Sequence, residues 1–524
     1  MYMSILRLSS TLESFKKYVA KNEQFDRNHP SAKVSSFWAS IFNERPNFPE
    51  LGELVAFRRN NNTWGSGDTW SEDIDIKKKE FQDTLETIKL FVPEEYLISI
   101  DEPVQGAPYI FKKDGIVLSA NFAMNSGTAW NLISEVKARL EQSKELNICE
   151  IGAGFGACAY MLHQALPIAN YTIVDLPENL CLSSTYLGTV LQDKVVKFID
   201  CQPTLKTVIS SNTLNFTLPS GIDNIDSKYD LMLNSFSFHE MDLEAVNSYF
   251  EFADRVLSNT GILVSFNSHD KAGVRKASQY SAQGLKLVGL KTFRSVPTGF
   301  FNTIAYEMIF VKNENREFKT DPRAIDVVCE MMQLGLDSDL KAIVEELLKG
   351  QITEKNQELI ESAHAFFYTK NENERKRHVQ TMAKDTNNVI FQFLVGNYKI
   401  LDGDIEGAKT HLERSCALGL KDFALLRSKV ILAIIYKIKG NISVHEQSLV
   451  SDIRKLSGGL YDEITALIER KQILQIRNKI AIILNDLDDN RFDLSFISKL
   501  RYLGFMGGAE YVRNKLLRKE LVGI

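Results

Sequence analysis

The stretch Asn147–Leu180, NICEIGAGFGACAYMLHQALPIANYTIVDLPENL, decides how the middle of the chain folds. A short apolar run leads into three glycines spaced two residues apart, Gly152, Gly154 and Gly156, and a helix-like segment follows them. A second apolar run ends at Asp175. Strands that alternate with helices predict a parallel sheet with crossover helices. Glycines between a strand and a helix are expected where the backbone turns tightly and approaches a ligand.

The same alternation continues through the apolar runs VVKFID, YDLMLNSF and GILVSFN. The last two runs, LKLVGLKTF and TIAYEMIFVK, are too close for an intervening helix, so they predict an antiparallel hairpin at the sheet edge. We therefore expect an α/β, Rossmann-like domain over residues 136–315. Residues 1–135 mix helical periodicity with turn-rich segments and are expected to form a mostly helical lid on the acceptor side. Residues 316–524 are expected to be helical throughout.

The helical tail contains a weak internal repeat in the segment GNYKILDGDIEGAKTHLERSCALG. Small and aromatic residues stand in the spacing of a tetratricopeptide unit, and the Tyr and Gly recur later; these residues are Tyr398, Gly403, Ala408 and Leu412, then Tyr436 and Gly440. A period of about 34 residues or slightly more fits stacked helix pairs. The tail is therefore interpreted as repeat-like, and as a surface for a protein partner or for self-association.

Charge and composition exclude several classes of protein. The 524 residues carry a net charge of −5, which argues against a dedicated nucleic-acid binder. No apolar run approaches about 18 residues, so no transmembrane helix is expected. The six cysteines lack metal-like spacing and are interpreted as reduced thiols. A cytoplasmic location is expected, with the periphery of the inner membrane as an alternative.

Three acidic residues lie at the ends of the predicted strands. Glu150 precedes the first glycine and suits a cationic amino group better than a pyrophosphate. Asp175, with Leu176 after it, follows the second strand, where a carboxylate can accept hydrogen bonds from both ribose hydroxyls. Asp200 closes the third strand and can accept from an adenine amino group. The combination fits S-adenosylmethionine (SAM) better than NAD, and NAD binding or a ligand-free sheet are the alternatives.

Three motifs, ICEIGAGFG, VDLPENLCLSSTYL and NSFSFHEM, together resemble the bacterial sugar O-methyltransferase family. The upstream segment EPVQGAPYIFKKDGIVLSANF is similar to that family's entry segment, so the resemblance covers roughly the first 315 residues. It implies a class I SAM-dependent domain and a sugar hydroxyl of a surface glycan, or of its precursor, as acceptor. By position it implies a cofactor site that includes Glu150, Gly152, Gly154, Asp175 and Asn234.

The loop after the fourth strand carries the candidate catalytic residues. Ligands of open parallel sheets bind beyond the carboxyl ends of the strands, and this loop brings His239 and Glu240 to that edge. A neutral histidine suits the role of general base near pH 7, and Glu240 can orient it. His269, after the fifth strand, is the second candidate. For both histidines the alternative is a loop side chain bonded to backbone.

Acidic residues at the same edge raise the question of a metal ion. Glu240, Asp242 and Asp270 stand near the expected acceptor, but their spacing singles out no ligand set. We therefore expect no required metal. Two other functions remain open at this point: methylation of a non-sugar small molecule or peptide, and an interaction scaffold whose methyltransferase domain is inactive.

Overall fold

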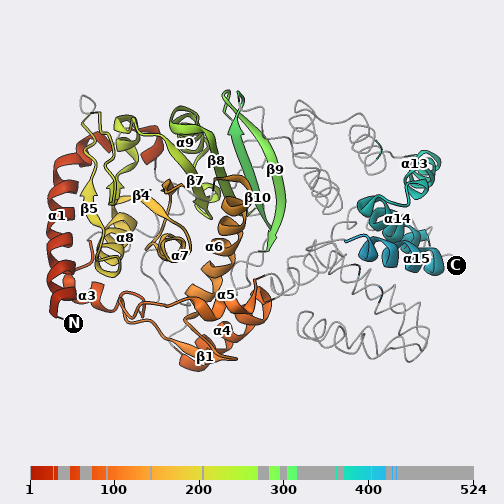
Figure 1. The fold of residues 1–524 in the computed structure, drawn as a ribbon, viewed down its shortest axis with the longest axis horizontal. Coiled ribbons are helices and arrows are strands. Elements are labelled where there is room, and N and C mark those ends of the chain that lie inside the picture. The colour runs from red at the N-terminus through yellow and green to blue at the C-terminus, as the bar shows by residue number, and fades with distance from the viewer. Residues whose placement is uncertain are drawn as a thin grey trace, which may run out of the picture. The chain divides into compact units, whose positions relative to one another are not determined.

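The structure of the protein is a computed structural model. It describes residues 2–26, 29–33, 48–59, 73–89, 92–141, 144–202, 206–268, 282–294, 304–314, 371–402 and 404–419, with the single positions 362, 428 and 432. The chain divides into two compact units, Met1–Lys319 and Thr320–Ile524 (Figure 1).

The first unit is built on an eight-stranded sheet. Its strands are β3 (Leu146–Ile151), β4 (Ile168–Val174), β5 (Val195–Phe198), β6 (Thr213–Thr217), β7 (Tyr229–Ser235), β8 (Leu257–Ser268), β9 (Leu285–Arg294) and β10 (Ile304–Lys312). They lie in the order β5-β6-β4-β3-β7-β8-β10-β9. The first six are parallel to one another, and β10 is antiparallel to both β8 and β9. The predicted α/β class and edge hairpin are confirmed.

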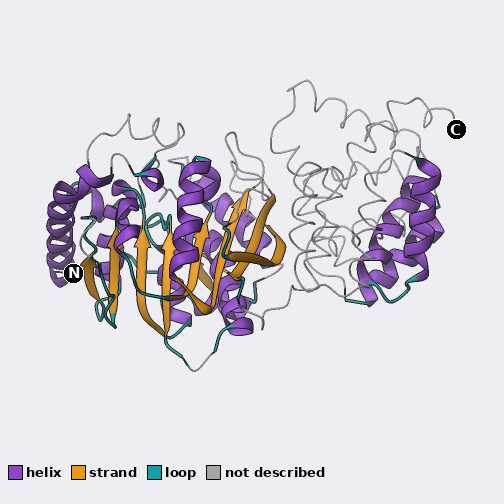
Figure 2. Ribbon diagram, turned by 90° about the horizontal axis from the view of Figure 1, so that it is seen from above, coloured by secondary structure: helices purple, strands orange, loops and turns teal. Residues whose placement is uncertain are grey.

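Crossover helices cover both faces of this sheet, in front of the strands and behind them in Figure 2. They are α7 (Ala157–Ala165), α8 (Pro177–Val190) and α9 (Leu243–Val256), and α6 (Ala120–Arg139) precedes the first parallel strand. Short 3₁₀ turns, η2 (Pro219–Asn224) and η3 (Phe238–Glu240), follow β6 and β7. The carboxyl ends of the parallel strands consequently meet at one edge, where loops are free to hold a ligand.

Strand β6 was missed in the sequence because its residues, TLNFT, alternate polar and apolar. All five are buried, and the polar ones bond locally. The Asn215 Nδ2 donates to Thr213 Oγ1 at 2.9 Å, and the Thr213 hydroxyl donates to the Ser210 carbonyl at 2.7 Å. The run VVKFID therefore forms the edge strand β5, with β6 between it and β4. Asp200, which follows β5, is one strand farther from Asp175 than expected.

The N-terminal region belongs to the same unit as the sheet. Its elements are α1 (Tyr2–Asp26), η1 (Pro30–Ala32), α3 (Leu51–Val55), α4 (Ile74–Ile88), α5 (Glu94–Ser99) and the hairpin β1 (Phe111–Lys113) and β2 (Ile116–Leu118). Helix α6 packs on α4 and α7 and runs across the boundary expected at 135/136, and the division into these domains stays a prediction. Helix α1 packs on α8, which explains why α8 is buried on nearly every side.

In the second unit the described residues form helices α13 (Glu372–Lys384), α14 (Val389–Asp402) and α15 (Ile405–Ala417). A Cβ placed on Gly396 would lie 2.7 Å from Leu412 Cγ and 3.3 Å from the Ala408 carbonyl, so α14 and α15 approach closely there. Tyr398, Ala408 and Leu412 are buried.

The tetratricopeptide assignment of the second unit stays a prediction, because Gly403, Tyr436 and Gly440 lie outside the described residues. Across the described parts of both units, none of the helices is long and apolar enough to span a bilayer.

Candidate functional site

All three glycines of the loop after β3 adopt left-handed backbone conformations. Their φ angles are 74° at Gly152, 57° at Gly154 and 95° at Gly156, which side chains other than hydrogen rarely tolerate. A Cβ on Gly152 would lie 2.1 Å from Ser237 Oγ, and one on Gly156 would lie 2.8 Å from Leu187 Cδ1. The glycine loop therefore packs closely between the loop after β7 and helix α8. Gly152 and Gly156 are required both by the left-handed backbone conformation and by the lack of space for a Cβ.

The carboxylate of Asp175 ties the end of β4 to the glycine loop. It accepts hydrogen bonds from the backbone N–H of Gly154 at 3.0 Å and of Leu176 at 2.8 Å. Asp175 is buried, and burial raises its pKa to about 7. Gly154, Asp175 and Leu176, which the sequence placed at one site, are thus in direct contact.

Glu150 is a second buried carboxylate beside this loop. It is the penultimate residue of β3, is 1% exposed, and accepts a hydrogen bond from the Tyr171 hydroxyl at 2.7 Å. Burial raises its pKa to about 7, and the nearby charge of Asp175 acts in the same direction. Among the described residues no basic side chain forms an ion pair with Glu150. A cationic ligand group would relieve the cost of ionising it.

Asn234 holds the loop after β7 in place. Its Nδ2 donates to the Ile151 carbonyl at 2.8 Å, and its Oδ1 accepts from Phe238 N at 3.2 Å. The same Oδ1 accepts from Asn267 Nδ2 at 2.9 Å, and Asn267 Oδ1 accepts from His239 N at 3.1 Å. Because both ends of the Asn234 amide bond within the protein, this residue supports the loop from behind.

The loop positions His239 next to Glu240 at the carboxyl edge. His239 is 2% exposed, and its Nε2 lies 3.5 Å from Glu240 Oε1. Phe236, two residues past Asn234, has a φ of 58°, a conformation that costs a non-glycine residue free energy and turns the chain sharply. The roles of His239 as base and of Glu240 as the residue that orients it stay predictions.

Other candidate residues of this edge are less informative. His269 and Asp270 lie outside the described residues. Asp242 precedes α9, and its Oδ2 lies 3.5 Å from Lys33 Nζ. Within the described ranges no group of three or more His, Cys, Asp and Glu side chains is arranged to hold a metal ion. The metal prediction remains untested.

Asp200 is engaged with the N-terminal helix. Its carboxylate forms an ion pair with Lys21 of α1 and accepts from Gln202 N at 3.0 Å. Asp200 thus follows the edge strand and is paired with α1, and its contact with an adenine amino group stays a prediction.

Asn179, in the first turn of α8, is a site residue that the sequence reasoning did not single out. Its Nδ2 donates to Asp175 Oδ1 at 3.3 Å, and it is 6% exposed. Its Oδ1 is buried and has no hydrogen-bond partner among the described residues. A buried polar atom normally has a partner, so this oxygen is available to a donor from a ligand. In the sequence, Asn179 follows Asp175 by four residues at the start of a helix, and this spacing could have indicated that the two side chains lie close together.

No family model and no curated protein matches the sequence. Several solved structures are similar. Magnesium protoporphyrin IX methyltransferase from Synechocystis PCC 6803, solved with bound SAM, aligns over 44% of this chain and 97% of its own, with 12% identity and a TM-score of 0.27.

A SAM-dependent methyltransferase from Clostridium acetobutylicum ATCC 824 aligns over 36% of this chain and 92% of its own, with 11% identity and a TM-score of 0.25. The mitomycin 7-O-methyltransferase MmcR aligns over 37% of this chain and 57% of its own, with 15% identity and a TM-score of 0.24. At such identities and TM-scores these likenesses do not decide the activity of this chain.

Proposed function

We propose that the protein is a SAM-dependent methyltransferase. The observation that carries this proposal is the pair of buried carboxylates, Glu150 and Asp175, on either side of a glycine loop at the carboxyl edge of a parallel sheet. Asp175 would accept hydrogen bonds from the ribose, and Glu150 would bind the amino group of the methionine portion. Asn179 Oδ1 provides a further acceptor beside Asp175.

NAD fits the same residues less well. A dinucleotide needs loop N–H groups turned to its pyrophosphate at a helix N-terminus. Here the Gly154 N–H donates to Asp175 instead, and two acids would repel a diphosphate. The site is therefore better suited to a ligand that carries a positive charge.

The proposed chemistry is transfer to a hydroxyl oxygen. When bound, SAM supplies a methyl group on a positively charged sulfur. His239 would accept the proton that leaves the acceptor hydroxyl, and Glu240 would orient the imidazole. Asn234 and Asn267 would keep both in place by fixing the loop backbone. Accurate positioning of the acceptor contributes much of the rate gain in such reactions.

A sugar of a bacterial glycan, or of its precursor, is the proposed acceptor. This part rests on the motif resemblance of residues 102–122, 148–156, 174–187 and 234–241. The alternatives are a non-sugar small molecule or peptide, and a scaffold that binds partners through its helical second unit.

The proposal is tested by incubating the protein with methyl-labelled SAM and separated glycan, small-molecule and peptide fractions of the source cell. We expect label in a glycan fraction, and mass mapping then locates the methylated oxygen. Label in the small-molecule or peptide fraction would show that the acceptor is not a glycan sugar. Binding of S-adenosylhomocysteine without label in any fraction would favour the scaffold.

A further inference from the structure

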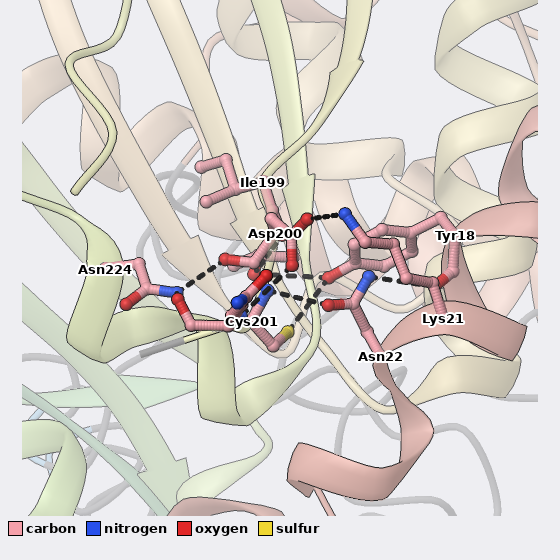
Figure 3. Close-up of polar contacts among 9 residues, drawn as sticks. Tyr18, Lys21, Asn22, Ile199, Asp200, Cys201 and Asn224 are labelled. Atoms are coloured by element: carbon pink, nitrogen blue, oxygen red, sulfur yellow. Dashed lines mark hydrogen bonds and ion pairs between the residues drawn. The ribbon is translucent and has the colours of Figure 1, made fainter. Parts of the chain in front are cut away.

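The second half of helix α1 lies across the carboxyl ends of β5 and β6 (Figure 3). The Tyr18 ring stacks on Phe198 with centroids 5.1 Å apart, and its hydroxyl accepts from Leu218 N at 2.8 Å. One turn later, Asn22 Oδ1 accepts from Cys201 N at 2.8 Å. Two side chains of α1 therefore accept hydrogen bonds from backbone N–H groups that follow two neighbouring strands.

Several other polar groups of this edge are also bonded within the protein, whereas the buried Asn224 Oδ1 has no hydrogen-bond partner among the described residues. Lys21 pairs with the Asp200 carboxylate. From the opposite side, Asn224 Nδ2 donates to the carbonyls of Asp200 at 2.6 Å and Gln202 at 2.9 Å (Figure 3). Asn22 is 1% exposed. Contacts from α1 and η2 therefore tie this edge together, and both oxygens of the Asp200 carboxylate have partners within the protein.

The position of this edge relative to the ligand site follows from the strand order. The glycine loop follows β3 and Asp175 follows β4, so a ligand that runs from the loop to Asp175 continues toward β6 and then β5. Asp175 is joined to that side directly, because its N–H donates to the Thr217 carbonyl at 3.3 Å. The Thr217 hydroxyl in turn lies 3.4 Å from the Tyr18 hydroxyl.

We propose that α1 forms the end wall of the base pocket, and that Tyr18 and Asn22 are its positioning residues. They hold the backbone at Leu218 and Cys201, and this fixed wall limits the space beyond the base. The inference rests on the proposed function, since it assumes that the ligand is an adenosine derivative. It assigns selection of the base to the shape of the pocket, with Asp200 serving to anchor α1.

The test compares two wall variants with a matched control on the same helix. Tyr18→Phe removes only the hydroxyl and keeps the stacking on Phe198, and Asn22→Ala removes the acceptor for Cys201 N. The control is Arg7→Ala. Arg7 also anchors α1, but its guanidinium donates to the carbonyls of Gln192 and Lys194. These two residues precede β5 and lie at the amino ends of the parallel strands.

The full-length proteins are titrated with S-adenosylhomocysteine and with the same compound carrying a benzyl group on N6. We expect wild type to bind the first and to bind the second at least about tenfold more weakly. Each wall variant should bind S-adenosylhomocysteine about tenfold more weakly, the shift that one lost hydrogen bond produces, and should discriminate less between the two ligands. Arg7→Ala should match wild type in both respects.

Two results overturn the inference. If both wall variants keep the wild-type affinity and discrimination, α1 does not bound the pocket. If Arg7→Ala shifts both quantities as far as the wall variants do, the effect is general loosening of α1. Absence of binding by wild type is a separate result, because it contradicts the proposed cofactor and removes the inference with it.

Discussion

Replacing Glu150 by glutamine should stabilise the ligand-free protein while weakening its cofactor binding. The carboxylate is 1% exposed, and burial raises its pKa from an ordinary value of 4.5 to about 7. The folded state therefore binds the Glu150 proton more tightly than the unfolded state does. This group's contribution to stability is complete below about pH 4.5 and is lost as the pH rises to about 7.

The size of the effect follows from the two pKa values. Their difference corresponds to about 3 kcal/mol of unfolding free energy by the time the carboxyl is ionised. Glu150→Gln removes this loss, because an amide carries no proton to lose, and its oxygen can still accept from the Tyr171 hydroxyl. At pH 8 the variant should be more stable than wild type by up to about 3 kcal/mol.

The assay is chemical denaturation followed between pH 4 and pH 8 for both proteins, using the transition that S-adenosylhomocysteine shifts in wild type. The other groups with shifted pKa values, such as Asp175 at about 7 and His163 at about 4, are common to both proteins, so the comparison isolates Glu150. The stability of wild type should fall with rising pH by one proton more than that of Glu150→Gln, and S-adenosylhomocysteine should bind the variant at least about tenfold more weakly through loss of a charged contact. A variant of unchanged stability with an unchanged pH slope would refute the buried-carboxylate reasoning.

Four further outcomes are expected. Gly154→Val should abolish S-adenosylhomocysteine binding measured by calorimetry, because a branched side chain fills the space of the methionine portion and φ at this position is 57°; unaltered binding would misplace the site. Asp175→Ala should weaken binding by about 1–3 kcal/mol in the same titration, and a smaller loss would argue against a ribose contact. His239→Ala should leave SAM affinity nearly intact but slow turnover by about 10²–10⁴-fold. The rise of the pH–rate profile near neutrality should disappear in this variant, and near-wild-type turnover would instead favour His269 as the base. A chain that ends after Lys319 should still bind the ligand, since the glycine loop and both carboxylates lie in the first unit, and loss of binding by the folded truncation would show that the second unit contributes.

Most of the strands that the sequence revealed are runs of mainly buried residues, and the partly exposed edge strand β5 is the exception. Strand β3 shows this pattern, and the glycines after it adopt the left-handed conformations that their spacing indicated. Strand β6 escaped notice because its residues alternate polar and apolar although all five are buried; Thr213 and Asn215 bond locally, and Thr217 donates to the Ile199 carbonyl after β5. Missing it placed Asp200 one strand too near the site.

Side-chain partners could not be read from the sequence for a similar reason. Asn234 was predicted as a cofactor-site residue, and the sequence did not reveal that its amide bonds to Ile151 and Asn267, which come from β3 and β8. Conversely, Asn179 became a candidate only when its buried Oδ1 was found beside Asp175 without a partner among the described residues. Long-range contacts of this kind depend on strand order, which local patterns do not encode.

The most direct test of the proposed cofactor is a calorimetric titration of the full-length protein with S-adenosylhomocysteine, repeated with NAD at the same concentrations. Two buried carboxylates beside the glycine loop predict saturable one-site binding of S-adenosylhomocysteine and no binding of NAD. Glu150→Gln should weaken the binding of S-adenosylhomocysteine and should not create binding of NAD. Saturable binding of NAD, with no heat from S-adenosylhomocysteine, would contradict the assignment of a SAM site.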